Sequence, residues 1–130
     1  MADTVSVQTI ADTVGVKHVV KMTNFSDGSG ESLVKKIDAS ATTFMSEDGN
    51  KKLAQIWWSV NTTNPKSCVE LLWDGSTNAS MGFFGGSGYI NLYDTGNMSQ
   101  NNATDPTGDV LLSTRNFAVG DNYTIIAEFR

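Results

Sequence analysis

Residues 17–32 read Lys17-His-Val-Val-Lys-Met-Thr-Asn-Phe-Ser-Asp-Gly-Ser-Gly-Glu-Ser32. The first part alternates as a β-strand does, because Val20 and Met22 fall on one face and lysines fall on the other. The segment Ser26–Gly30 then supplies residues that tolerate positive φ and favour a turn. An apolar run resumes at 33–37. We therefore predict a β-hairpin in which this turn joins two neighbouring strands.

The strongest strand pattern lies further along the chain, at Leu53–Val60. Ile56, Trp58 and Val60 share one face of this segment, while Gln55, Trp57 and Ser59 share the other. A second alternating run, Cys68–Trp73, follows a polar turn and is the predicted partner strand. We expect Trp58 and Trp73 to form the aromatic centre of the core.

Four further strands are predicted from alternation and turn residues, at 79–84, 89–93, 109–114 and 123–130. Gly85–Gly88 is interpreted as a hairpin connection, and Asp94–Gly108 as the longest loop. No window carries a helical stripe. The predicted fold is all-β, an antiparallel β-sandwich or jelly-roll-like small barrel of about eight strands. Residues 15–130 form a single β domain in this prediction, and residues 1–14 an extended N-terminal arm or edge strand.

Composition narrows the possible partners. The chain has 130 residues and a formal net charge of -5, so we expect neither nucleic acid nor an anionic membrane surface as a partner. No run approaches the length of a membrane span, and the N-terminus lacks the features of a signal peptide. The single cysteine, Cys68, allows no intrachain disulfide and is expected to be buried or half-buried.

The titratable residues do not form a recognisable catalytic or metal-binding pattern. The only histidine, His18, lies within a strand and has no nucleophile motif to serve, so a structural or surface role is expected. The acids at 47–48, Asp27 and Glu31 are interpreted as solvated turn residues, and the lysine pairs at 35–36 and 51–52 as solubilising. We expect no catalytic residue, no metal and no cofactor, and hence a protein that is not an enzyme.

Three aromatic residues are candidates for binding because alternation places them on a strand face opposite the core. They are Trp57, Tyr89 and Tyr93. Exposed aromatic rings on a β-sandwich stack on sugar rings or anchor a protein interface. The same pattern also fits plain core packing, if a further layer covers this face.

The hairpin sequence resembles that of a family of small virion structural proteins from tailed bacteriophages. The similarity spans nearly the whole chain in order. After Lys17–Ser32 it continues at Lys35-Lys-Ile-Asp-Ala-Ser40, Ile56-Trp-Trp58, Leu71-Leu-Trp-Asp-Gly-Ser-Thr-Asn78, Thr107-Gly-Asp-Val-Leu-Leu-Ser-Thr114 and Gly120-Asp-Asn-Tyr-Thr-Ile-Ile-Ala-Glu128.

The resemblance implies a capsid decoration, or cement, protein that is made in the host cytoplasm and binds the outer shell of the virion. Its implied partners are the major capsid protein and further copies of itself, with a trimer favoured. Two alternatives stay open: a structural protein of the tail, baseplate or fibre, and a carbohydrate-binding module for attachment to the host surface. Position and composition suggest contacts on the arm Thr4–Thr13, on the loop Asn97–Thr107 and on the strand face that carries the three aromatic candidates. The candidate interface residues are Val5, Val7, Thr9, Trp57, Tyr89, Tyr93, Met98, Asn101 and Asn102.

Overall fold

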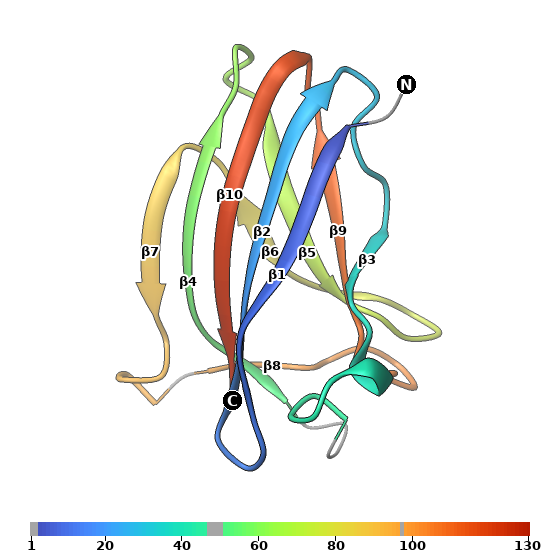
Figure 1. The fold of residues 1–130 in the computed structure, drawn as a ribbon, viewed down its shortest axis with the longest axis vertical. Helices are drawn as coiled ribbons and strands as arrows, with labels where there is room; N and C mark the ends of the chain where they lie inside the picture. The colour runs from blue at the N-terminus through green and yellow to red at the C-terminus, as the bar shows by residue number, and fades with distance from the viewer. Residues whose placement is uncertain (1–2, 47–50, 97) are drawn as a thin grey trace.

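The structure, a computed structural model, describes residues 3–46, 51–96 and 98–130. Two antiparallel β-sheets pack face to face in it (Figure 1). The strands and the single 3-10 turn, in chain order, are β1 (Thr4–Thr13), β2 (Lys17–Asp27), β3 (Val34–Ile37), η1 (Ala39–Ala41), β4 (Lys52–Asn61), β5 (Cys68–Trp73), β6 (Ala79–Phe84), β7 (Ser87–Asn91), β8 (Ser99–Gln100), β9 (Val110–Arg115) and β10 (Val119–Phe129).

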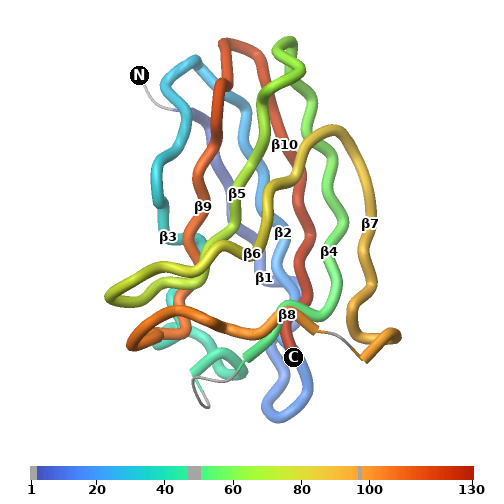
Figure 2. Tube along the Cα trace, turned by 180° about the vertical axis from the view of Figure 1, so that it is seen from behind, coloured from blue at the N-terminus to red at the C-terminus, as the bar shows by residue number. Residues whose placement is uncertain are grey.

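Sheet A has the strand order β1-β2-β10-β4-β7, and the short β8 also pairs with β4. Sheet B has the order β3-β9-β5-β6 and lies in front when the molecule is seen from behind (Figure 2). All pairings in both sheets are antiparallel. The prediction of an all-β antiparallel sandwich is therefore confirmed, with ten strands in the described residues in place of about eight.

The predicted hairpin at residues 17–32 is wrong. Strand β2 pairs with β1 and β10 in sheet A, whereas β3 pairs with β9 in sheet B. The turn between them carries the chain from one sheet to the other, with positive φ at Gly28, Gly30 and Leu33. The hairpin partner of β2 is β1, which joins it through a turn closed by the Val16 N–H donating to the Thr13 carbonyl at 3.0 Å. Alternation finds strands, but it does not tell which sheet a strand joins.

Two other predicted pairings fail in the same way. Strand β4 pairs with β10 and β7, and β5 pairs with β9 and β6, so β4 and β5 lie in different sheets. The Gly85–Gly88 connection joins β6 of sheet B to β7 of sheet A and is not a hairpin. A sandwich needs such crossings because consecutive strands face each other across the core. The long loop before β9 also contains β8.

The core between the sheets is apolar and aromatic. Trp73 and Phe129 meet edge to face, with ring centroids 5.4 Å apart, and both are buried. Trp58 is only partly buried and packs against the core beside Phe84. Gly88 makes room for it, because a Cβ at this position would lie 2.5 Å from Cζ2 of Trp58. The prediction that both tryptophans form the centre of the core therefore holds for Trp73, whereas Trp58 lies at the margin of the core.

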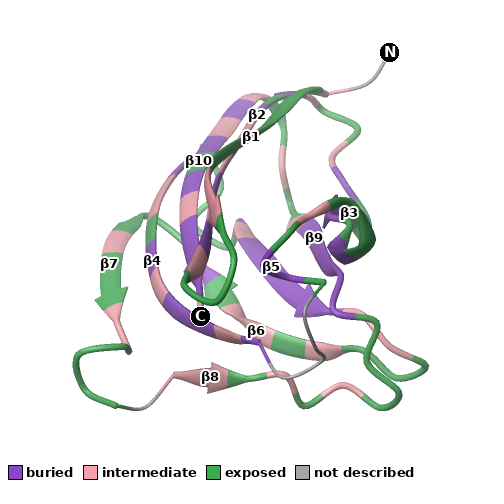
Figure 3. Ribbon diagram, turned by 60° about the horizontal axis from the view of Figure 1, so that its bottom comes forward, coloured by how far each residue is buried: buried purple, intermediate pink, exposed green. Residues whose placement is uncertain are grey.

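Alternation determines which side chains this core receives. Along β10, buried residues alternate with less buried ones, as the bands in Figure 3 show. The buried row of β10 consists of Tyr123, Ile125, Ala127 and Phe129, and on β2 the face predicted for Val20 and Met22 is buried. The inward row of β2 is polar at both ends, with buried His18 at one end and buried Asn24 and Ser26 at the other.

Candidate functional site

The outer face of sheet A carries apolar and aromatic side chains that the core does not use. Trp57 on β4 lies opposite Tyr89 on β7 and opposite Ile126 on β10. Val19 on β2 and Ile10 at the β1 bulge continue the surface toward the sheet edge. We call these five residues the aromatic face. Tyr89 is 48% exposed and Trp57 38%, so no further layer of the described chain covers this side of the sheet.

Trp57 and Tyr89 stack on each other. Their ring centroids are 4.8 Å apart and their planes differ by 17°. The Tyr89 hydroxyl donates a hydrogen bond of 2.8 Å to Oε1 of Gln55, which fixes the tyrosine ring against the tryptophan. Each ring therefore covers one side of the other. The second side of Trp57 faces away from β7, toward β10 and β2.

A shallow hollow of about 460 Å³ lies on that second side of Trp57. It is lined by Ile10, Ala11, Lys17, Val19, Trp57, Ile126 and Glu128. The lining is mostly apolar, with the two charged residues in ion-pair contact: Nζ of Lys17 lies 3.9 Å from Oε1 of Glu128. An aromatic wall, an aliphatic floor and a charged rim suit an apolar side chain or the apolar face of a ring.

Glu128 is held in its charged form by its neighbours. Its carboxylate accepts hydrogen bonds from Nε2 of Gln55 at 3.0 Å and from Nε of Arg130 at 2.9 Å. Burial opposes ionisation, but the bonds from Arg130 and Gln55 outweigh it and lower the pKa of Glu128. The rim of the hollow thus stays charged at neutral pH.

The N-terminal segment forms the edge strand β1 of sheet A, on the far side of the sheet from β7. Val5 and Val7 pair with inward-facing residues of β2, yet both remain exposed. Thr9 lies in the same row, next to the bulge. These three predicted interface residues therefore share a surface with one another, but that surface is not the aromatic face.

Both ends of β1 are held by carboxylates. Asp3 accepts hydrogen bonds from Nδ2 of Asn24 at 2.9 Å and from the backbone N–H of Asp27 at 3.0 Å and of Gly30 at 3.2 Å. Partial burial opposes its ionisation, but these hydrogen bonds prevail and lower the pKa of Asp3 to about 2. At the other end, Asp12 accepts two backbone N–H bonds of 2.7 Å, from residues 43 and 44.

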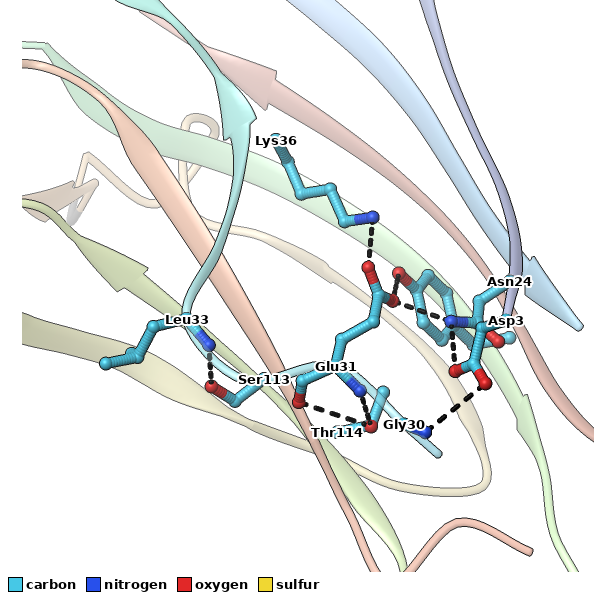
Figure 4. A network of polar contacts seen from close by, with 9 residues as sticks. Asp3, Asn24, Gly30, Glu31, Leu33, Lys36, Ser113 and Thr114 are labelled. Atoms are coloured by element: carbon cyan, nitrogen blue, oxygen red, sulfur yellow. Dashed lines mark hydrogen bonds and ion pairs between the residues drawn. The ribbon is translucent and has the colours of Figure 1, made fainter. Parts of the chain in front are cut away.

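A buried polar network joins the crossing segment to β2 and β10, and Figure 4 shows it from close by. Oε1 of Glu31 accepts bonds of 2.7 Å from both Asn24 and the Tyr123 hydroxyl, and Oε2 pairs with Nζ of Lys36. The backbone N–H of Glu31 donates a hydrogen bond of 2.8 Å to Oγ1 of Thr114. The backbone carbonyl of Glu31 accepts a hydrogen bond of 2.9 Å from the N–H of Thr114. Burial, the bond to Glu31 and its charge raise the pKa of Tyr123. This network closes one end of the sandwich.

The network corrects two sequence interpretations. Glu31 is not a solvated turn acid, because only 5% of its side chain is exposed. Lys36 is not a solubilising lysine, since its side chain is 2% exposed. Lys51 is also buried, and its ammonium lies 3.9 Å from the centre of the Phe44 ring. Lys35, by contrast, is half-exposed and pairs with Asp109 at 3.0 Å. The acids at 47–48 lie outside the described residues.

His18 is buried on the inward face of β2, with Nδ1 3.4 Å from Oδ1 of Asp12. It lies next to Asp12, the residue that holds the end of β1, and not in a hollow of the surface. Cys68 is half-buried. In the described part of the chain, no three His, Cys, Asp or Glu side chains gather where they could hold a metal ion. Within residues 3–46, 51–96 and 98–130 there is also no helix with the length and apolar character that a membrane-spanning helix requires.

The remaining predicted interface residues lie at one end of the sandwich. Tyr93 follows β7, and its ring is covered by the Arg130 guanidinium at 4.1 Å. Met98 and Asn102 line an open, polar depression of about 410 Å³ beside Lys52. The side chain of Asn101 turns back and accepts the backbone N–H of Ala103 at 3.1 Å. Asn97, the first residue of the predicted contact loop, lies outside the described residues.

The structure thus divides the sequence candidates among three surfaces, and of the three predicted aromatic residues it brings Trp57 and Tyr89 together. Three members of the aromatic face were not predicted: Ile10, Val19 and Ile126. The alternation that places Ile125 in the core also places Ile126 on the outer face, so this signal was present in the sequence. Comparisons with protein-family models, with curated proteins and with solved structures gave no match.

Proposed function

We propose that this protein is a structural component of a bacteriophage virion, a capsid decoration protein that binds the outer shell and stabilises it against the pressure of packaged DNA. The family resemblance of the sequence suggests this role. The structural observation that carries the proposal is the aromatic face, where Trp57 and Tyr89 stay exposed beside the half-buried Ile126 on the side of sheet A that faces away from the core. Such a surface fits a protein interface, because aromatic residues dominate the energetics of binding.

The geometry suggests how the protein would hold a shell subunit. Trp57 is fixed by its stack on Tyr89 and by a rigid sheet, so little conformational entropy is lost when it is buried. The hollow beside it accepts one apolar side chain of the partner, and the Lys17–Glu128 pair at its rim gives orientation. Several copies around a symmetric shell add avidity.

Binding to empty expanded shells of the phage that encodes the protein tests this proposal. Trp57→Ala is expected to cost about 2 kcal/mol, which is a loss of about 30-fold in affinity, as for a central anchor of an interface. Phe83→Ala is the matched control, because Phe83 is exposed on β6 of the other sheet. Equal affinity of the two variants and the unaltered protein would refute the proposed surface, and failure to bind any shell would refute the role.

Location within the virion and oligomeric state are part of the same proposal. A copy number close to that of the major capsid protein in purified virions would support a place on the head. A copy number of a few per particle would favour the alternative, a protein of the tail, baseplate or fibre. The trimer implied by the family resemblance is a prediction about copies bound to the shell, and three-fold symmetric density on the shell surface checks it.

Carbohydrate binding is the second candidate, and one observation favours it: the free side of Trp57 forms the wall of a hollow with polar groups at its rim. Aromatic rings stack on the apolar faces of sugars, while carboxylates and amides bind the hydroxyl groups. A glycan array with the unaltered protein and Trp57→Ala tests it. Binding that the substitution abolishes would support a host-attachment module, and a blank array would leave the shell proposal as the better one.

A further inference from the structure

We propose that β1 pairs through its open edge with β1 of a second copy of this chain, so that two sheets A join across a two-fold axis. This dimer is independent of the virion role, since it needs only the isolated protein. The inference rests on the open edge, on its uncovered valines, on the clamps at its ends and on the self-complementary order of its residues.

The first observation is that β1 is a long strand with one unpaired edge. Within the described residues it pairs only with β2, over nine residue pairs. An unpaired edge leaves backbone N–H and C=O groups available to another strand, and proteins protect such edges with lysine, proline, bulges or short strands. The part Thr4–Thr9 has none of these protections, because the bulge comes only after Thr9.

The other edges are protected in these ways. Strand β3 has four residues and carries two lysines. Strand β6 has an irregularity opposite Leu71 and Leu72, and it contains Gly82. Strand β7 has five residues. A contact between sheet edges is therefore expected at β1.

The second observation is that Val5 and Val7 point to the core side of sheet A without being covered. They are 47% and 44% exposed, although their partners on β2 are buried. The edge strand of sheet B is the short β3, and the residues beside β3 that face sheet A form the polar network of Glu31 and Lys36. These valines are thus left for a partner that extends sheet A beyond β1.

The third observation is that β1 is held in place and does not behave as a loose arm. Asp3 fastens its start to the segment that follows β2, and Asp12 fastens its end to residues 43 and 44. The strand between these clamps keeps its extended shape before any partner arrives. A preorganised edge loses little conformational entropy when it pairs.

The order of residues identifies a second copy as the occupant. In an antiparallel pair of identical strands centred near Val7, the valines and Thr9 of one copy lie beside those of the other, and Ser6 lies beside Gln8. No charged side chain lies between Thr4 and Ala11, and the acids that flank this stretch, Asp3 and Asp12, are each hydrogen-bonded to their own chain. The two-fold axis is perpendicular to the joined sheet, so both aromatic faces lie on the same side.

The first test measures the mass of the isolated protein by sedimentation or light scattering as its concentration is raised. We expect twice the mass of the single chain. Val7→Lys places a charge and its symmetry mate at the seam and is expected to shift the dissociation constant upward by at least about tenfold. Val14→Lys, an equally charged change at an exposed position of the turn after β1, is the matched control and leaves the dimer intact.

A cysteine scan keeps the test decisive if Val7→Lys impairs folding. In a Cys68→Ser background, single cysteines at 5, 6, 7 and 8 are oxidised in turn. Only a cysteine on the two-fold axis lies at disulfide distance from the same cysteine of the other copy. One of the four positions is therefore expected to cross-link efficiently. Val14→Cys, which lies outside the seam, is the control and is not expected to cross-link. A protein that stays monomeric, a trimer, or a dimer that persists in folded Val7→Lys without cross-linking in the scan would overturn the proposal.

Discussion

The buried pair of Glu31 and Lys36 makes the stability of this sandwich sensitive to one lysine. Lys36→Met removes the ammonium but keeps most of the aliphatic chain. The Glu31 carboxylate then stays buried with only two neutral donors, Asn24 and Tyr123. Removing one partner of a buried ion pair costs about 3 kcal/mol or more, because the remaining charge is left without compensation.

The expected shift in melting temperature follows from the size of the chain. At about 2.1 cal/mol/K per residue, 130 residues give an unfolding entropy of about 0.27 kcal/mol/K, so each kcal/mol lowers Tm by about 4 °C. Lys36→Met should thus lower Tm by about 11 °C in differential scanning calorimetry. Lys35→Met is the control, because the Lys35 side chain is half-exposed and the Asp109 carboxylate with which it pairs keeps its hydrogen bond from the Ala39 N–H, so Tm should fall much less.

The double variant Glu31→Gln with Lys36→Met tests the cause of this loss. The glutamine amide that replaces the Glu31 carboxylate keeps an oxygen that accepts from Tyr123 and Asn24, and neither position of the former ion pair then carries a charge. Most of the lost stability should return, to within about 1 kcal/mol of the unaltered protein. The reasoning is refuted if Lys36→Met costs no more than Lys35→Met, or if the double variant is as unstable as the single one.

Three further results are expected. Gly75→Ala should cost about 1–3 kcal/mol by thermal unfolding, because its Cβ would lie 2.3 Å from the Thr104 carbonyl oxygen, whereas Gly85→Ala, where the nearest backbone atom is at 3.4 Å, should be mild. Acid should loosen the start of β1. The pKa of Asp3 is lowered in the folded protein, so its stabilisation is complete above about pH 4 and is lost as the pH falls toward 2. Over that range the protection of amides near Asp3 against hydrogen exchange should fall in the unaltered protein and change less in Asp3→Asn. Trp57→Ala should lower stability by only about 1 kcal/mol, since it removes a surface stack and no core residue, and a larger loss in urea unfolding would contradict an exposed binding face.

The strands and their faces could be predicted from the sequence, because alternation is a local property. The pattern at Leu53–Val60 correctly placed Ile56 inside and Trp57 outside. The same reasoning placed Val20 and Met22 on the face opposite the lysines, and both are buried. These residues need only a strand with one buried face, whichever sheet that strand joins.

The pairing of strands could not be predicted in the same way. An Asp-Gly turn after β2 fits a hairpin as well as a crossing between sheets, and neighbouring strands pair often enough to favour the hairpin. The partner of β2 across the sheet is β10, about a hundred residues away in the sequence. No local signal reports a contact of that range.

The polar interior was missed for a related reason. Glu31 and Lys36 read as surface residues, because charged residues are rarely buried unless they are paired. Their burial depends on Tyr123 and Asn24, which other strands bring to the same place. The aromatic face was predicted only in part. Outward residues of β10 and β2 lie beside Trp57 because these strands are neighbours in sheet A, and the order of the strands could not be read from the sequence.

The most direct test of the proposed role is an electron cryo-microscopy map of empty expanded shells incubated with this protein, beside the same shells with Trp57→Ala. Our account predicts density for the sandwich on the outer surface, with the outer face of sheet A and Trp57 turned toward the shell. The density should be lost or strongly reduced with Trp57→Ala. Shells that bind no protein, or protein docked through sheet B with Trp57 facing solvent, would contradict it.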